Sequence, residues 1–483
     1  MKRLIVISAI IASSMQLVHS QNEVDALRYT QTTPFGTSRF VAMGGALGAL
    51  GADFSTLSTN PAGMGLFKSS EFTISSAFYI GRTESEYTGS PSRNDYKYNF
   101  NFPSVGLVYT FFERGKFVEK PGWRNVQFGF GINRLANFNN RAIIEGFNDK
   151  NSLITSYIEQ AKGIKYTNLD NFSTGLAYDT YLMDPTGVDS NQYVSFLSNG
   201  GVLQRKTIQT NGSINEVVLS LAGNYSDKLY VGGSLGFPFI RYNETSRYTE
   251  SDRDNVFNDF NSYTLREELS TTGAGINLKI GMIYKPVEFL RLGLAFHTPT
   301  VYYNMEDTWN KRIDANFNSM PNLYSQSPTG NYTYELTTPM KVMGSVGFLF
   351  GKMGAIGVDY EFVDNSESRL RSDDYDYYNE NNAIQDNYTS SSNIRIGTEW
   401  KLEPISFRAG YSIYGSPYQT GINDGKKTVM SFGIGYREKT YYIDCAYSYS
   451  KANEDYYLYS GVGDPVKNTI TGSNFMMTLG FKF

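Results

Sequence analysis

Cysteine and histidine are almost absent from this chain of 483 residues. Cys445 is the only cysteine, so an intrachain disulfide and a cysteine-based metal site are both excluded. His19 lies in the first twenty residues, which leaves His297 as the only histidine after them. One imidazole cannot build a histidine-based zinc site within a single chain. We therefore expect no metal and no cofactor.

Long apolar runs and an excess of basic residues are also lacking. No segment after residue 20 approaches the roughly eighteen apolar residues that a membrane-spanning helix needs. Lys and Arg number 43 against 47 Asp and Glu, so the chain is mildly acidic and a nucleic-acid partner is not expected. Aromatic residues, in contrast, make up 15% of the sequence, and they suit β-strands and membrane interfaces.

The first twenty residues, MKRLIVISAIIASSMQLVHS, predict a secretory signal peptide. Lys2 and Arg3 form a positive start, an apolar stretch continues to Val18, and Ser20 precedes a cleavage point at Gln21. The apolar stretch is short and no stop-transfer pattern follows it, which argues against a membrane anchor. Residues 1–20 are thus expected to be removed as the chain leaves the cytoplasm.

Alternation of apolar and polar residues recurs from about residue 70 to the end and predicts β-strands. In the last segment, SNFMMTLGFKF, Phe475, Met477 and Phe481 share one face, while Thr478 and Lys482 share the other. The same pattern is present in TYYIDCAYSY, ISFRAGYSIY, NIRIGTEWK and AIGVDYEF. We count about fourteen strands, an even number, as a bacterial outer-membrane barrel requires.

The predicted connections alternate between short turns and long polar loops, which is typical of a transmembrane β-barrel. The long loops cover residues 139–206, 247–263, 304–331 and 364–391. We therefore predict an all-β fold, an antiparallel transmembrane β-barrel over residues 70–483 with these loops outside the cell. A soluble all-β protein with a second sheet over its apolar face is the alternative. Leu153, Tyr157 and Ile158 recur at helical spacing and predict a short helix in the longest loop.

Two motifs suggest an enzyme or a nucleotide site, and both lack the expected context. GGSLG at residues 232–236 matches the nucleophile pattern G-x-S-x-G, but Ser234 lies inside a predicted strand with no helix after it. His297 would be its only histidine partner. The glycine-rich GGALGALGAD does not follow a strand, so it does not indicate a phosphate-binding loop. We expect no enzymatic activity.

An acidic loop, RSDDYDYYNENN, holds Asp373, Asp374, Asp376 and Glu380. These carboxylates could supply oxygen ligands to calcium. Because they have no fixed ligand spacing, we predict a solvated loop instead.

Charged residues on the predicted inward face have two interpretations. They could form a salt-bridge network that supports the barrel, or an Arg or Lys could bind the anionic head group of a ligand, because guanidinium pairs with carboxylate. The charged residues are Lys279, Arg291, Arg395, Arg408, Arg437, Asp359, Glu361, Glu399 and Asp444. The candidate head-group contacts are Arg291, His297, Arg395 and Arg408.

The alternation in YKYNFNFPSVGLVYTF changes phase at Pro103. Tyr98 and Phe100 lie on one parity, whereas Leu107 and Tyr109 lie on the other. An extra bulged residue at Pro103 would let both halves face lipid, and proline cannot donate a hydrogen bond to a neighbouring strand. A side opening of the wall and a plain strand break near a turn both fit this pattern.

The N-terminal stretch SRFVAMGGALGALGADFSTLSTNPAGMGLF resembles the start of the FadL/TodX family of outer-membrane transporters for hydrophobic compounds. The shared residues are Ala42 to Ala46, Asp53 and the tetrad Asn60-Pro61-Ala62-Gly63. LRLGLAFHTPT and ISFRAGYSIYGSPY are similar to later strands of that family. The resemblance implies a barrel of about fourteen strands, with residues 21–69 folded inside it as a hatch. It also implies that hydrophobic ligands leave sideways into the membrane beside a kinked strand, for which Pro103 is the candidate.

Gly44, Gly45 and the tetrad Asn60, Pro61, Ala62 and Gly63 are the candidate gate residues. The small residues from Gly44 to Gly51 suit a closely packed short helix. Asn60-Pro61 would end that helix with a fixed turn before the first strand.

The resemblance implies an outer-membrane channel for passive uptake of long-chain fatty acids or aromatic hydrocarbons, gated by the N-terminal hatch, and we expect it to be a monomer. The expected partners are the ligand, outer-membrane lipid and the barrel-assembly machinery, which would recognise the C-terminal strand ending in Phe483. The alternative is a FadL-like barrel that acts as a docking or shuttle component of a secretion system. Some family members are labelled haem receptors, but His297 alone cannot provide bis-histidine ligation, although a Tyr could ligate haem.

Overall fold

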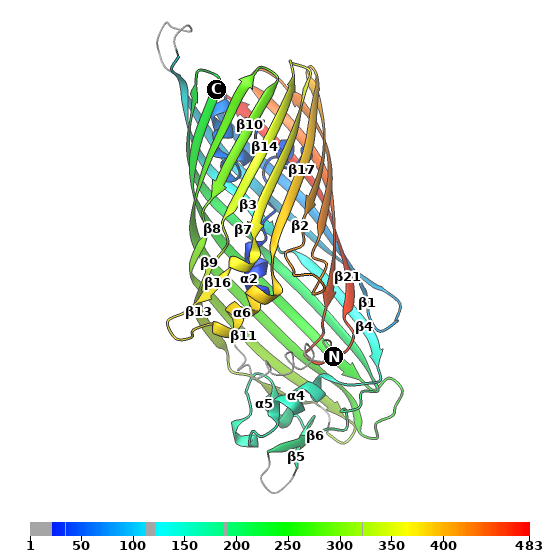
Figure 1. Ribbon diagram of the computed structural model, residues 1–483. Coiled ribbons are helices and arrows are strands. Elements are labelled where there is room, and N and C mark those ends of the chain that lie inside the picture. Colours follow the sequence, from blue (N-terminus) through cyan, green and yellow to red (C-terminus); the bar gives the residue numbers. More distant parts are fainter. Residues whose placement is uncertain (1–21, 34, 113–120, 187–190, 321) are drawn as a thin grey trace, which may run out of the picture.

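The computed structural model describes residues 22–33, 35–112, 121–186, 191–320 and 322–483, so the predicted signal peptide lies outside the described residues. Its strands form a closed antiparallel β-barrel of 14 strands, which confirms the predicted fold class. The barrel is closed by β1 (Glu71–Glu86), which pairs along its whole length with β21 (Val466–Lys482). Figure 1 shows the tilted strands surrounding the N-terminal segment.

Several barrel strands consist of two consecutive segments. β3 (Trp123–Asn137) and β4 (Asn140–Asn148) both pair with β7 (Val202–Tyr225), and β10 (Leu290–His297) and β11 (Val301–Phe317) both pair with β9 (Phe260–Val287). Pro299 separates β10 from β11, where it removes one amide donor. The other two-segment strands are β14 (Lys341–Phe350) with β13 (Gly330–Thr337), and β15 (Gly354–Asp364) with β16 (Arg369–Arg371).

The remaining barrel strands are β2 (Arg93–Phe112), β8 (Leu229–Ser251), β17 (Ser390–Leu402), β18 (Ile405–Tyr414), β19 (Lys427–Arg437) and β20 (Tyr441–Tyr456). A short β12 (Leu323–Gln326) pairs with β11. None of the helices in the described part of the chain is long and apolar enough to cross a membrane.

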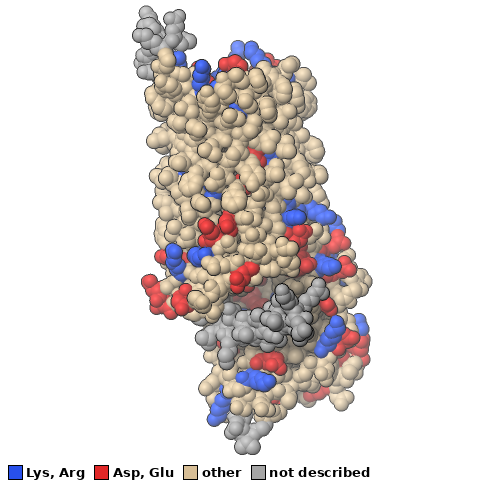
Figure 2. Space-filling model, in the orientation of Figure 1, with Lys and Arg blue, Asp and Glu red and all other residues tan. Residues whose placement is uncertain are grey.

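The two faces of each strand meet different surroundings, as the alternation predicted. On β21, Phe475, Met477 and Phe481 are exposed on the outer face, while Asn474 and Thr478 are buried. Figure 2 shows that charged residues gather over the lower part of the molecule and at its upper rim, leaving a largely uncharged band between. This band is the surface expected to contact lipid.

The wall is much taller on one side than on the other. β7, β8 and β9 have 24, 23 and 28 residues, whereas β17, β18 and β19 have 13, 10 and 11. The loop boundaries predicted at 139–206, 247–263, 304–331 and 364–391 are therefore wrong. Strands continue into these ranges, where polar residues occupy both faces and resemble loop sequence.

The longest connection forms a folded cap at the lower end in Figure 1. It contains α4 (Leu153–Ala161), α5 (Thr174–Asp179) and the hairpin β5 (Asp184–Thr186) and β6 (Gln192–Val194). The predicted helix is confirmed, with Leu153 and Tyr157 on its buried side. Cap residues share one apolar core with wall residues such as Tyr248 and Tyr263, so the cap fills the tall end of the barrel.

The predicted loop at 364–391 is largely folded, although Asp373, Asp374 and Asp376 of its acidic stretch are exposed, as predicted. It contains η4 (Asn365–Glu367) and α6 (Tyr378–Asn387), and its Tyr377 and Ile384 are fully buried in a core shared with the N-terminal helix. Glu380 is buried and accepts a hydrogen bond from the hydroxyl of Tyr375. Among the described residues there is no cluster of acidic, histidine or cysteine side chains that could hold a metal ion.

The N-terminal segment inside the barrel has three parts. Helix α2 (Glu23–Thr30) is followed by a strap, defined as residues 31–33 and 35–36, and then by the hatch body, residues 37–69. The hatch body contains α3 (Ser38–Ala42), η1 (Phe54–Ser58) and η2 (Pro61–Leu66). The helix predicted from Gly44 to Gly51 is absent, because Gly44, Gly45 and Gly51 adopt positive φ angles in successive turns. Asn60 and Pro61 begin η2 and do not end a helix.

Candidate functional site

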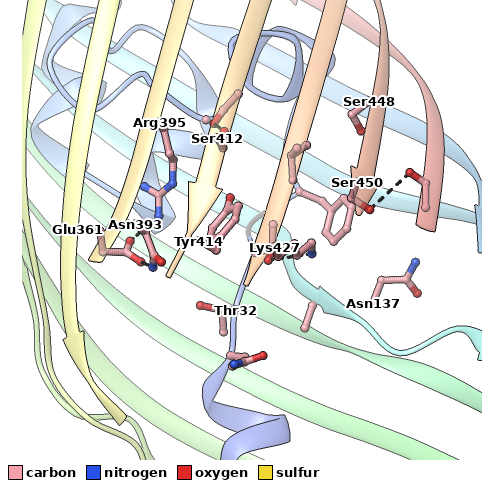
Figure 3. Close-up of a pocket in the computed structure, with 18 of the residues that line it drawn as sticks. Thr32, Asn137, Glu361, Asn393, Arg395, Ser412, Tyr414, Lys427, Ser448 and Ser450 are labelled. Carbon is pink, nitrogen blue, oxygen red and sulfur yellow. Dashed lines mark hydrogen bonds and ion pairs between the residues drawn. The ribbon is translucent and has the colours of Figure 1, made fainter. Parts of the chain in front are cut away.

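A cavity of about 350 Å³ lies inside the barrel, between the strap and the inner faces of the short strands. Its apolar lining comes from Phe35, Phe40, Val41 and Phe138, and its polar lining from Asn, Ser and Lys residues at the ends of β14 to β21. Figure 3 shows Glu361, Asn393, Arg395, Tyr414 and Lys427 directed toward this space, with Thr32 below them. The lining can therefore accommodate a molecule that has both an apolar and a polar part.

Two lysines that line the cavity contact the strap, and neither forms an ion pair within 4 Å of a carboxylate among the described residues, although Glu361 acts electrostatically on Lys341. The Lys341 ammonium donates to the hydroxyl of Thr32 at 2.7 Å, and the Lys427 ammonium donates to that of Thr33 at 3.3 Å. Both lysines are half-buried. Lys427 also lies 5.8 Å from the centre of the Tyr414 ring.

The other cations at the cavity are already neutralised. Arg395 donates to Glu361 at 2.6 Å, and Arg28 pairs with Asp25 on the same helix. Burial raises the pKa of the Asp25 carboxyl above its ordinary value, and the adjacent Arg28 guanidinium opposes that rise.

Arg395 is the only one of the four predicted head-group contacts that lines this cavity. Arg291 donates to the backbone carbonyl of Leu50 at 2.8 Å and lines a second cavity on the other side of the hatch body. Arg408 is enclosed by Glu399 and Asp444, each at 2.7 Å. The Nε2 atom of His297 lies 2.5 Å from the carbonyl oxygen of Thr59. The salt-bridge interpretation thus describes Arg395 and Arg408, whereas Arg291 and His297 hold the hatch body.

Sequence reasoning missed Lys341, Lys427, Thr32 and Thr33. Lys341 and Lys427 are the first residues of β14 and β19, so no alternation on their N-terminal side marks them as inward-facing. Their position beside the strap is a property of the folded barrel alone.

The hatch body rests on a belt of wall glycines. Gly347, Gly357, Gly397 and Gly410 lie directly opposite one another across β14, β15, β17 and β18. A Cβ at Gly397 would lie 2.2 Å from the carbonyl oxygen of Met43, closer than any real Cβ contact. The belt therefore lets the hatch backbone approach the wall where a side chain would keep it away.

The tetrad is part of this tightly packed body. Asn60 is fully buried, its amide donates to the carbonyl of Gly48 at 2.7 Å, and its carbonyl oxygen accepts from the Ala62 amide at 3.2 Å. Gly63 approaches Thr56 closely, and its carbonyl accepts from the Ala52 amide at 2.9 Å. The tetrad thus joins the glycine-rich turns around Gly48 and Ala52 to helix η2.

The pairing of β2 with its neighbours is irregular at Pro103. β2 pairs with β1 with a register shift between Ser75 and Ala77, opposite Pro103. In the described part of the chain, β2 pairs with β3 only from Ser104 to Phe112. The strap covers part of the edge that β3 leaves free, because the amides of Thr33 and Phe35 donate to the carbonyls of Leu135 and Arg134, each at 2.9 Å.

Comparison with known proteins identifies the family. A family model described as outer membrane protein transport protein (OMPP1/FadL/TodX) matches residues 17–482. The chain belongs to this family. It is accordingly a protein of the bacterial outer membrane. Comparison with curated proteins returns no sequence relative.

Solved structures of FadL/TodX proteins share the fold at low sequence identity. The Pseudomonas putida toluene transporter TodX has a TM-score of 0.54 and 12% identity, covering 94% of this chain and 100% of that one. A Pseudomonas aeruginosa FadL homologue has a TM-score of 0.53 and 12% sequence identity, and the match covers 94% of this chain and 99% of that one. The Ralstonia pickettii toluene transporter TbuX has a TM-score of 0.51 and 15% sequence identity, and the match covers 92% of this chain and 98% of that one.

The geometry of this FadL/TodX-family barrel also bears on the enzyme motif. Ser234 lies within β8, is 1% exposed and hydrogen-bonds the hydroxyl of Ser220 on β7. His297 lies on β10 and contacts Thr59. Each candidate catalytic side chain is thus engaged in packing the barrel and its hatch.

Proposed function

We propose that this protein is a passive channel for the uptake of amphipathic small molecules with an apolar body and an anionic head, such as long-chain fatty acids. The observation that carries the proposal is the cavity beside the strap. It combines an apolar lining of Phe35, Phe40 and Phe138 with Lys341 and Lys427, neither of which forms an ion pair within 4 Å of a carboxylate in the described residues. A cation in a partly desolvated site favours an anionic ligand group.

The route proposed here leads from the long-loop side into the cavity and out through the gap between β2 and β3. The hatch body separates this cavity from the second one at the short-turn end, which Leu50, Ala52 and Phe67 help to line. Lateral release beside Pro103 would deliver an apolar ligand to the membrane without passage through the hatch body.

Uptake of labelled dodecanoate tests the proposal in cells that lack the chain and in cells complemented with it. We expect complementation to restore uptake, and the double variant Lys341→Met/Lys427→Met to lower it roughly tenfold, which corresponds to about 1.4 kcal/mol of lost binding free energy. Lys439→Met is the matched control, because Lys439 is an exposed turn residue away from the cavity.

Labelled toluene provides the second arm of the experiment. Restoration of toluene uptake alone would assign the channel to neutral hydrocarbons. Unchanged uptake of both compounds, with loss of protein export in the deleted cells, would support the docking or shuttle alternative instead.

A further inference from the structure

Three arginines form a row across the outer face of the tall side of the wall. Arg247 on β8 lies directly opposite Arg266 on β9, and Arg266 lies directly opposite Arg312 on β11. These strands run side by side to the cap end of the barrel (Figure 1). Next to each arginine in the chain is a residue buried in the core that the cap shares with the wall, and these neighbours are Tyr248, Leu265 and Ile313. The three arginines, here termed the arginine row, therefore point away from the barrel interior.

The arginine row carries more positive charge than the carboxylates around it balance. Asp314 pairs with Arg312 at 2.6 Å and with Arg266 at 3.2 Å, so two guanidinium groups share one carboxylate. Among the described residues, Arg247 forms no ion pair within 4 Å. Glu268, on the same face of β9, accepts a hydrogen bond from an asparagine amide at 3.3 Å. Like charges that lie directly opposite each other destabilise a sheet, so an anion bound across the row is stabilising.

The arginine row lies well beyond the apolar band of the wall. On β8, the outward residues Leu235, Phe237 and Phe239 are exposed and apolar, and Arg241 is the first charged outward residue after them. Arg247 follows Arg241 roughly 20 Å further along the strand, at about 3.3 Å per residue. The end of such a barrel that carries the long connections faces the outside of the cell. The row is therefore placed in the sugar layer above the outer leaflet of the membrane.

The surface between Arg241 and the arginine row suits contact with sugars. Its outward residues on the three strands are mostly hydroxyl and amide side chains, namely Asn243, Thr245, Ser270, Thr308 and Asn310. Such groups both donate and accept hydrogen bonds. At the edge of the row, the Arg312 guanidinium lies 4.3 Å from the centre of the Tyr324 ring, which holds it in place. The side chains of Arg266 and Arg312 are still 48% and 36% exposed, so both are accessible to a ligand.

We propose that the arginine row binds phosphate groups on the sugars of a neighbouring lipopolysaccharide molecule. This glycolipid fills the outer leaflet of a typical bacterial outer membrane, and phosphates on its sugars supply the missing negative charge. Guanidinium pairs bidentately with phosphate, and Arg247 is the main contact because no carboxylate of the wall competes for it. The row spans two strand spacings, about 10 Å, a length that two linked sugars cover.

This docking surface gives the tall side of the wall a role of its own. The strands β8, β9 and β11 extend beyond the apolar band and present their outward face to the glycolipid layer, while their inward face supports the cap. The inference is independent of the uptake route proposed above, since the arginine row and the cavity beside the strap lie on opposite faces of the wall.

Binding of fluorescently labelled rough lipopolysaccharide with a phosphorylated core tests the docking surface on the purified full-length barrel in detergent micelles. We expect Arg247→Gln to weaken binding roughly tenfold and Arg247→Gln/Arg266→Gln/Arg312→Gln to weaken it roughly a hundredfold, because hydrogen bonds between charged groups are lost. Arg253→Gln is the matched control, since Arg253 is an exposed arginine of the β8–β9 connection that already pairs with Asp254. Arg247→Gln breaks no ion pair of the folded wall, and heat-modifiable mobility on unboiled gels verifies that each variant is folded.

The identity of the anion is tested with three further probes. The same lipopolysaccharide with its phosphates removed by hydrofluoric acid should bind weakly and equally to the parent protein and to Arg247→Gln. Phosphatidylglycerol and inorganic phosphate should fail to displace the labelled glycolipid. Equal affinity of the parent and the triple variant, undiminished binding of the dephosphorylated glycolipid, or displacement by either competitor would overturn the proposal.

Discussion

Single glycines determine how the hatch body fits the barrel wall. The belt at Gly347, Gly357, Gly397 and Gly410 removes every side chain from the inner face at one level of four neighbouring strands. At Gly357 and Gly397, hatch carbonyl oxygens occupy the space that a Cβ would need. At this level, the hatch body therefore contacts the wall through its backbone atoms more than through its side chains.

Gly397→Val tests this seat. The added side chain collides with Met43, so we expect the hatch body to shift at a cost of about 1–3 kcal/mol and the channel to become leaky. Vancomycin sensitivity of cells expressing the variant measures the leak. The control is Gly344→Val on β14, where nothing lies within 4 Å of the added Cβ. A folded Gly397→Val barrel as tight as the control would contradict the proposed seat.

Among the elements, the cap depends on one buried carboxylate. Glu250 at the end of β8 accepts hydrogen bonds from the Ser152 hydroxyl, the Leu153 amide, the Gln204 side chain and the Tyr248 hydroxyl. Two of these donors, Ser152 and Leu153, belong to the N-terminus of α4. Glu250 therefore joins the cap to the wall where α4 begins.

Replacing Glu250 by Ala should release the cap while the barrel stays folded. The buried donors lose their acceptor, which costs on the order of 1–3 kcal/mol for each unsatisfied group. We expect trypsin to cut at Lys162 or Lys165 several times faster in the variant, as followed by gel electrophoresis. Glu159→Ala, an exposed residue of α4, is the matched control. Unchanged cleavage at both lysines would show that the apolar core alone holds the cap.

The elements also show where sequence reasoning reached its limit. The alternation that ends at Phe483 was sufficient to predict the barrel, because two-faced strands need two different surroundings. The phase change at Pro103 likewise predicted the irregularity that the pairing of β1 and β2 shows. Asn60 was misassigned, since a cap residue followed by proline can begin a helix as readily as end one. Lys341 and Lys427 could not be found, because their significance depends on which strands lie opposite each other.

At the scale of the whole molecule, the barrel is closed by its two terminal strands. The chain end contributes to this closure, because the Phe483 amide donates to the carbonyl of Ser70 at 3.1 Å and its ring packs edge-on against Tyr109 at 5.6 Å. We also propose that the assembly machinery recognises this terminal residue and that the finished barrel is a monomer.

Removal of Phe483 should lower the amount of assembled barrel without changing the strap or the cavity. The heat-modifiable fraction on unboiled gels measures assembly, and we expect a several-fold decrease relative to the parent chain. Phe483→Tyr, which keeps the ring, should restore it. Full assembly of the truncated chain would show that closure by β1 and β21 does not need its last residue.

The pairing of β1 with β21 has a consequence for the order of folding. Because these two strands complete the barrel along the whole of β1, closure requires nothing from residues 22–36. The strap can add to β3 only after the β3 edge exists in its final form. We therefore expect the last step of maturation to be the insertion of the chain's own beginning into a barrel that its end has already closed.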